Sequence, residues 1–314
     1  MSTAELKKRI VAAEAERSKH PVAFRPDRLQ QAKLEKGRRA SEEMMSGLLR
    51  EAGLDTKKFA ALQQQRTIEL ERMVDKHKAE ALRRASRRRG TLHPSISAQT
   101  AALQALAGSE FFPNPTYSFP TPFLVWTTPL QNISDSAIVP FGSWAKFRFG
   151  TSQRRGVQKV SFYFQGTNPL NDYVLINAST FLSATGHLKA HAPWTFGANA
   201  SSVQATALLN LWVGLPSAVT SSQHGSEVLG RARALSFITS GGDTTGTSIS
   251  SGVSLHATHF AVPPGALLVM EVALAIEYDN DDGNIDADFE SGDFKIACPV
   301  VVVSLLNRPF LNAV

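Results

Sequence analysis

The residue pattern changes near His93, and this change limits the chain to two kinds of structure in one polypeptide. Before it, charged residues recur at helical spacing; after it, short apolar runs alternate with Gly, Pro, Ser and Thr. Residues 1–93 hold 23 Lys and Arg against 13 Asp and Glu, whereas the rest of the chain holds 10 against 14. The net charge of +6 therefore describes neither part. We expect a helical, basic assembly or anchor region over 1–92, a linker over 93–122 and an antiparallel β domain over 123–314.

Three helices are predicted in the first region, over residues 4–19, 26–52 and 55–89. Ser2, followed by Glu5, forms a capping box for the first of them. Asp55 is a suitable N-cap for the third and longest helix. Self-association through these helices is expected, although the pattern does not indicate its order.

The third predicted helix is amphipathic with an imperfect seam. Its apolar positions favour one side: Phe59, Leu62, Leu70, Met73, Val74, Ala81 and Ala85. Arg66 and His77 fall in the same stripe, so the pattern falls short of several clean heptads. Such a helix can pack on a neighbouring element or on another chain.

The densest basic cluster consists of Arg83, Arg84, Arg87, Arg88 and Arg89. It could contact nucleic-acid phosphates or an acidic partner surface, in a salt-dependent way. The alternative is a solvated helix end that complements the helix dipole. The acidic residues on the same helix, Glu69, Glu71, Asp75 and Glu80, favour a salt-bridged surface or an interface over a plain nucleic-acid tail.

The linker holds a predicted short helix over 97–106 and a Pro/Phe-rich arm over 111–122. Proline at this density prevents a helix or a central strand, so we expect an extended connector. The arm is expected to pack on its own domain. Exchange of the arm between subunits would use the same residues.

From Phe123 onward the apolar period becomes two, which is typical of strands with one buried and one solvated face. Val160, Phe162 and Phe164 alternate with Lys159, Ser161 and Tyr163, and the run from Leu268 to Tyr278 places Glu271 and Glu277 on its polar face. About ten strands without alternating long helices predict an α+β, predominantly β chain whose main domain is an antiparallel sandwich or jelly roll. Segment 150–156 and the Asp-Asp-Gly-Asn segment over 281–284 are predicted to turn hairpins.

The acidic loop over 279–290 offers a weak candidate metal site. Its ligands would be Asp279, Asp281, Asp282 and Asp286, and Ca²⁺ would be the cation. The match to a calcium loop fails at its first and twelfth positions. The competing interpretation is a hairpin in which Asp286, Asp288 and Glu290 form the solvent face of a strand.

The tryptophans raise the possibility of carbohydrate binding through ring stacking. Trp194 follows a proline in a turn, and Trp212 lies in an apolar strand, where large aromatic side chains are ordinarily core. Trp144 is predicted to face outward beside Lys146 and Arg148, and it is the candidate glycan contact.

Other site classes find no support in the sequence. Cys298 is the single cysteine and is predicted to be a buried thiol, so no disulfide framework is expected. His187 and His191 lie about 13 Å apart on a predicted strand, too far for one metal ion. No nucleophile elbow or phosphate-binding loop occurs. Without a signal peptide or an apolar span, we expect a protein synthesised as a soluble cytoplasmic polypeptide, with no cofactor.

These patterns favour a non-enzymatic, self-assembling structural or interaction protein, with the sandwich as a shell, spike or head. The arrangement of a basic helical arm and a sandwich resembles capsid or phage-structure proteins in architecture. We therefore expect a homo-oligomer formed through the helices and the Pro/Phe arm, and an assembled particle. The alternative is a carbohydrate-binding module on a helical stalk. A hydrolase whose groups converge only in the fold is a third class.

Overall fold

The computed structural model describes most of the chain. The described residues are 2–19, 55–87, 116–127, 133–194, 199–216, 223–236 and 242–306, with positions 47, 50, 51 and 53. The predicted helix over 26–52 lies almost entirely outside these residues, and the one over 97–106 lies wholly outside them.

Two of the predicted helices are confirmed, and each begins at its predicted cap. Helix α1 spans Thr3–Lys19, and the backbone N–H of Glu5 donates to Ser2 Oγ at 3.2 Å. Helix α3 spans Thr56–Arg87, and Asp55 Oδ1 accepts from the N–H groups of Lys57 and Lys58 at 3.0 and 3.2 Å. These bonds satisfy N–H groups that have no partner within the helix.

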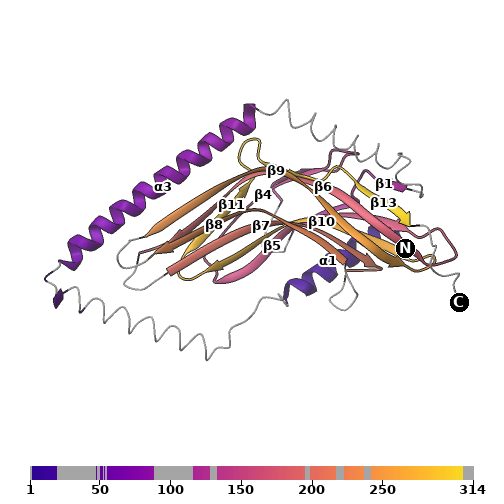
Figure 1. The fold of residues 1–314 in the computed structure, drawn as a ribbon, viewed down its shortest axis with the longest axis horizontal. Helices are drawn as coiled ribbons and strands as arrows, with labels where there is room; N and C mark the ends of the chain where they lie inside the picture. Colours follow the sequence, from indigo (N-terminus) through magenta and orange to yellow (C-terminus); the bar gives the residue numbers. More distant parts are fainter. Residues whose placement is uncertain are drawn as a thin grey trace.

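The rest of the described chain forms two antiparallel sheets (Figure 1). Sheet A contains β1 (Thr116–Phe119), β3 (Asp135–Ala137), β4 (Trp144–Thr151), β6 (Val174–Ala192), β9 (Asp243–Val262), β11 (Asn284–Phe289), β12 (Lys295–Ala297) and β13 (Val301–Leu306). Sheet B contains β2 (Leu124–Thr127), β5 (Arg155–Thr167), β7 (Asn199–Val213), β8 (Gln223–Ser236) and β10 (Leu267–Asn280), in the order β2-β5-β10-β7-β8. The predicted fold class, predominantly antiparallel β, is confirmed.

Strand β6 is the central strand of sheet A and pairs with four other strands. It pairs with β9 along one edge, from Val174↔Val262 to Ala192↔Asp243. Along its other edge it pairs with β13, β12 and β11 in turn. The C-terminal apolar run is divided between β12 and β13 by the segment 298–300, which holds Pro299, because proline has no N–H to give to a ladder.

The core lies between the two sheets. Alternate side chains of each strand point inward, and Phe147, Phe162, Leu188 and Leu274 are fully buried there. Phe147 stacks on Phe289, with ring centroids 5.2 Å apart. The apolar positions predicted to face inward in β5 and β10 are therefore confirmed.

Several predicted connections are wrong. Segment 150–156 does not turn a hairpin, because β4 belongs to sheet A and β5 to sheet B. The acidic turn over 281–283 likewise joins β10 of sheet B to β11 of sheet A. Residues 174–192 form one strand, β6, and residues 243–248 begin β9. Alternation is the same in either partner sheet, so it cannot identify which strand pairs with which.

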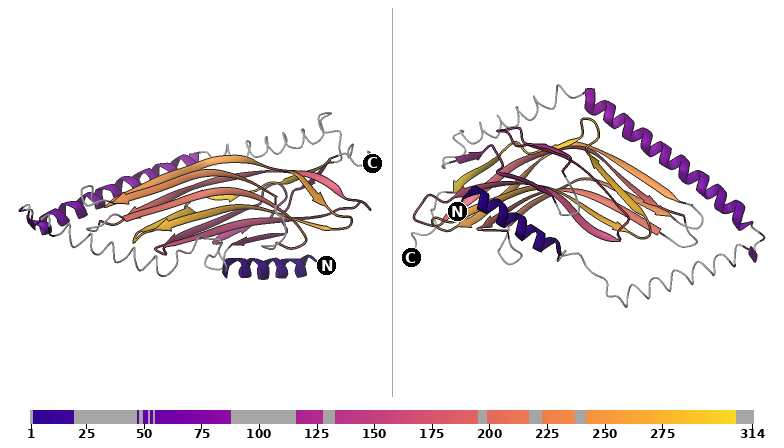
Figure 2. Two further views of the ribbon diagram at one scale, coloured as in Figure 1. Left: turned by 60° about the horizontal axis from the view of Figure 1, so that its bottom comes forward. Right: turned by 180° about the vertical axis from the view of Figure 1, so that it is seen from behind.

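The two helices lie on opposite outer faces of the sandwich (Figure 2). α1 packs on sheet B, and α3 packs on sheet A against β9 and β6. Faces that the sequence predicts to be solvated are therefore partly covered by helix. Among the residues described, no helix is long and apolar enough to cross a membrane.

Candidate functional site: two helix-docking surfaces

α1 docks on sheet B through a stripe of side chains spaced four residues apart. Leu6 and Ile10 are buried against Tyr163, Trp212 and Val269. Full burial of an aliphatic side chain of this size is worth about 1.5–3 kcal/mol. This spacing places the next residue of the stripe, Glu14, over the same sheet.

Glu271 of β10 lies at the centre of this α1 docking surface and is fully buried. Its Oε1 accepts hydrogen bonds from Lys159 Nζ at 2.6 Å, Ser161 Oγ at 2.6 Å and Tyr163 OH at 3.1 Å. Its Oε2 accepts from Asn210 Nδ2 at 2.9 Å. Both oxygens are thus satisfied without water, as a buried carboxylate requires.

Glu14 joins the helix to this network. Tyr163 OH lies 2.8 Å from Glu14 Oε1, and Lys159 Nζ lies 3.1 Å from Glu14 Oε2. Glu14 is 2% exposed, so the polar contact is sealed between helix and sheet. The sequence-based prediction that Tyr163 and Glu271 face solvent is wrong, because α1 covers that face.

The charges of the network explain its pKa values. Burial raises the pKa of Tyr163 well above its usual value, and the nearby Glu271 and Glu14 carboxylates add to the effect, so the phenol stays neutral. Burial alone would raise the pKa of Glu271, but the Lys159 charge and the hydrogen bonds that Glu271 accepts lower it. The network therefore contains ionised Glu271 beside Lys159 and a neutral tyrosine donor.

α3 docks on sheet A through a mixed stripe. The side chains of its docking face are buried or partly buried: Gln63, Thr67, Val74, Lys78 and Ala85. Leu62 and Met73, predicted to belong to the apolar stripe, are 65% and 52% exposed. That part of the prediction is wrong, because polar side chains of α3 meet charged side chains of the sheet.

Lys78 of α3 forms the principal ion pair of this α3 docking surface. Its Nζ lies 2.5 Å from Asp288 Oδ2 and 3.8 Å from Asp286 Oδ2. Burial alone would raise the pKa of Asp288, but hydrogen bonds from Lys78 and Ser291 and from the backbone lower it to about 2. The prediction that Asp288 lies on a solvent face is wrong: it is 0% exposed beneath α3.

Two histidines of β6 also face α3. His191 Nδ1 lies 3.6 Å from Glu71 Oε1 and 2.8 Å from Thr244 Oγ1. Burial, mainly, lowers the pKa of His191. His187 is 1% exposed, and burial together with the Lys78 charge lowers its pKa to about 4.

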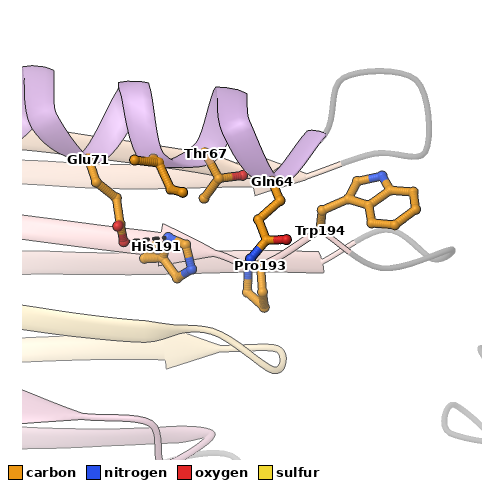
Figure 3. A pocket seen from close by; sticks show the side chains of 7 residues that line it. Gln64, Thr67, Glu71, His191, Pro193 and Trp194 are labelled. Atoms are coloured by element: carbon orange, nitrogen blue, oxygen red, sulfur yellow. Dashed lines mark ion pairs between the residues drawn. The ribbon is translucent and has the colours of Figure 1, made fainter. Parts of the chain in front are cut away.

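An open groove of about 430 Å³ lies where the N-terminal half of α3 passes the end of β6. It is lined by Gln64, Thr67, Ile68, Glu71, His191, Pro193 and Trp194. Figure 3 shows the Glu71–His191 ion pair at one end of the groove and Trp194 at the other. The groove offers an aromatic surface together with amide, hydroxyl and carboxylate groups, a composition suited to a polar ligand.

The predicted basic cluster lies at the C-terminal end of α3. Arg83, Arg84 and Arg87 are exposed, and Arg84 pairs with Glu80 at 3.6 Å. Arg88 and Arg89 lie outside the described residues. The structure thus shows three exposed arginines, one of them paired within the helix.

The acidic loop places its carboxylates against arginines. Asp279 pairs with Arg155, and Asp286 accepts from Arg148 Nε at 3.0 Å and Nη2 at 3.1 Å. Within the part of the chain that is described, no group of three or more His, Cys, Asp or Glu side chains could hold a metal ion.

The predicted glycan contact, Trp144, is the first residue of β4 and is half-buried. Lys295 Nζ lies 6.0 Å from the centroid of its ring, so a cation already occupies that ring face. Cys298 is buried as predicted, and burial raises its thiol pKa to about 12. The thiol is therefore protonated and inert at neutral pH.

Glu14, Lys159 and His187 belong to the two docking surfaces, and the sequence indicated none of them as a docking residue. The signal for Glu14 was its position four residues after Ile10 in the buried stripe of α1. No local pattern marks Lys159 or His187, because their partners come from distant elements.

Comparisons with known proteins add little. No protein-family model and no curated protein match the chain. The carbohydrate-binding module TmCBM61, solved in complex with β-1,4-galactotriose, is 6% identical, with a TM-score of 0.18 over 48% of this chain and 69% of that chain. The module TmCBM27, described for specific mannan recognition, is 11% identical, with a TM-score of 0.21 over 61% and 96%. The enzymatically active domain of bacteriophage CBA120 tailspike protein 4 is 11% identical, with a TM-score of 0.22 over 58% and 19%. TM-scores this low carry no argument about function.

Proposed function

We propose that this is a non-enzymatic structural protein that assembles by docking its helices onto the sandwiches of neighbouring copies. The observation that supports the proposal best is the buried network in which Glu14 of α1 meets Lys159, Tyr163 and Glu271 of sheet B. A charged, fully partnered contact of this kind fixes one helix position on the sheet, because any other register would leave buried charges unpaired.

The lengths of the connecting segments permit this docking between copies. Residues 20–55 separate α1 from α3, and residues 88–115 separate α3 from β1. A segment of 28 residues can span at most about 90–100 Å. Each helix can therefore reach the sheet of an adjacent copy, and the same contacts would then link the chains.

Light scattering tests the proposal. The full chain is expected to have a multiple of its 34.0 kDa chain mass. A double variant with Ile10→Asp and Val74→Asp places a charge in each docking surface and is expected to reduce the particles to single chains.

The matched control is Val11→Asp with Met73→Asp. Both residues neighbour the substituted ones in sequence but are exposed, at 40% and 52%. The control is expected to assemble as the parent does. A full chain that weighs 34.0 kDa at every concentration would overturn the proposal.

Within such an assembly, the exposed Arg83, Arg84 and Arg87 would face an acidic partner surface or nucleic acid. Binding of the parent chain to a DNA duplex is expected to weaken as salt is added. Replacing the arginines from Arg83 to Arg89 with glutamine is expected to abolish this binding. Binding that persists in the variant, or that does not weaken with salt, would rule out the phosphate role.

Carbohydrate binding is the second candidate, and the groove beside Trp194 is the observation that favours it. A glycan array of the parent chain would be compared with Trp194→Ala and Trp144→Ala. Binding that is lost with Trp194→Ala supports the groove, and binding that is lost with Trp144→Ala supports the contact predicted from the sequence. Failure of the parent to bind any glycan would reject this function.

A further inference from the structure

His187 lies beneath the middle of α3, in contact with helix and sheet. Its side chain is 1% exposed, and neither ring nitrogen has a hydrogen-bond partner among the described residues. A Cβ atom on Gly246 of β9 would lie 2.9 Å from the His187 ring and 2.7 Å from Val74 Cγ1. The His187 ring and the Val74 side chain of α3 therefore both pack over Gly246 of β9.

The charged groups facing His187 are either carboxylates that are already paired or lysines, which would repel a protonated ring. They are Lys78 of α3, Lys189 of β6, and Asp286 and Asp288 of β11. Asp288 holds Lys78 at 2.5 Å, and Asp286 accepts two hydrogen bonds from Arg148. A proton on His187 would add a third cation beside Lys78 and Lys189, and no described residue accepts a hydrogen bond from either ring nitrogen.

A buried cation without a partner is strongly unfavourable, whereas a solvated imidazolium is not. The ring can reach water if the helix above it moves away. We propose that His187 is an acid-operated latch: protonation of its ring releases α3 from sheet A. Protonation of His187 would weaken docking equally whether α3 belongs to the same chain or to a neighbouring copy. The latch can therefore be correct even if the proposed function is wrong.

The direction and size of the effect follow from linkage. The pKa of His187 is about 4 with α3 docked, lowered first by burial, against 6.5 for a solvated histidine. Docking is therefore strongest above pH 6.5 and weakens as the pH falls toward 4. A difference of about 2.5 pH units corresponds to a docking equilibrium weakened by up to about 300-fold.

Hydrogen exchange of the full chain measures this release. The observable is the protection factor of α3 amides over residues 63–82, each rate being divided by the unstructured rate at the same pH. We expect protection of α3 to fall by about 150-fold between pH 7.5 and 4, because the full effect is reached only below pH 4. Protection in β5 and β10 of sheet B is expected to stay constant and reports that the sandwich remains folded.

Two variants separate His187 from other acid effects. His187→Gln is expected to remove the fall in protection, whereas His77→Gln, which alters an exposed histidine of α3, is expected to leave it unchanged. Constant protection in the parent chain, or an equal fall in His187→Gln, would overturn the latch. A contribution from protonation of Asp288 would appear only below about pH 3.8, as the pH falls toward 2.

An NMR titration of His187 in the unsubstituted protein tests the latch without relying on a variant that could fail to fold. The ¹³Cε1 chemical shift of His187 in the intact protein gives its pKa directly. A pKa well below the ordinary value of 6.5 supports the latch. A value near 6.5 would refute it, because docking would then be insensitive to the His187 proton.

Discussion

Glu271 is the residue on which the α1 docking surface depends most, because four donors converge on its carboxylate. We expect Glu271→Gln to lower the free energy of unfolding by about 3 kcal/mol, since it removes one partner of a buried ion pair. Glu277→Gln, at an exposed position of the same strand, is expected to change it by less than about 0.5 kcal/mol. Urea titration of both variants checks this, and equal losses would contradict it.

Asp288 gives a second prediction, on the dependence of stability on pH. Its carboxyl has an ordinary pKa of 3.8 and a folded pKa of about 2, so its contribution is complete above pH 3.8 and declines as the pH falls toward 2. Between pH 4 and 2, the parent is expected to lose about 2 kcal/mol more stability than Asp288→Asn. Asp135→Asn, at an exposed position, should follow the parent in the same denaturant titrations; parallel losses in all three would argue against the Lys78–Asp288 contact.

The burial of these residues beneath a helix could not be predicted from the sequence pattern. Alternation separated the two faces of β5 and β10 correctly, and Val160, Phe162 and Leu274 are buried as predicted. It could not tell a face that meets water from a face that meets a helix. Tyr163 and Glu271 were therefore predicted to be solvated although α1 covers them.

At the scale of elements, the close approach of α3 to β9 depends on Gly246. Adding a Cβ there would require Val74 or the His187 ring to move, because it would lie within 3 Å of both. We expect Gly246→Ala to cost about 1–3 kcal/mol and to reduce hydrogen-exchange protection in α3 selectively. Gly150→Ala, whose Cβ would meet no atom closer than 3.6 Å, should be tolerated. A Gly246→Ala protein with fully protected α3 would contradict this packing.

Helix ends and strand positions were predictable because their causes are local. Ser2 and Asp55 cap α1 and α3 as their side-chain chemistry indicates. Strand partners were not predictable, because β4 and β5 lie in different sheets although only a short segment separates them. Pairing depends on contacts between residues far apart in sequence, which a local pattern does not encode.

At the scale of the molecule, the sandwich has a helix on each outer face, and ion pairs hold both helices. The change of residue pattern near His93 predicted helical and β-rich parts. It did not predict that the helices pack directly on the sheets, because the residues that join them are ordinary surface types in the sequence: Glu14, Lys78 and Lys159.

A disulfide trap would show whether α3 docks on the sheet of its own chain or on that of a neighbouring copy. A Cβ on Gly242 would lie 3.3 Å from Thr67 Cβ of α3, near the range for a disulfide. Thr67→Cys with Gly242→Cys, oxidised in the assembled protein, would record which chain α3 docks on, while Cys298 stays buried and protonated. Denaturing electrophoresis without reductant is predicted to give bands at multiples of 34.0 kDa. A single 34.0 kDa band containing an internal disulfide would contradict assembly by helix exchange.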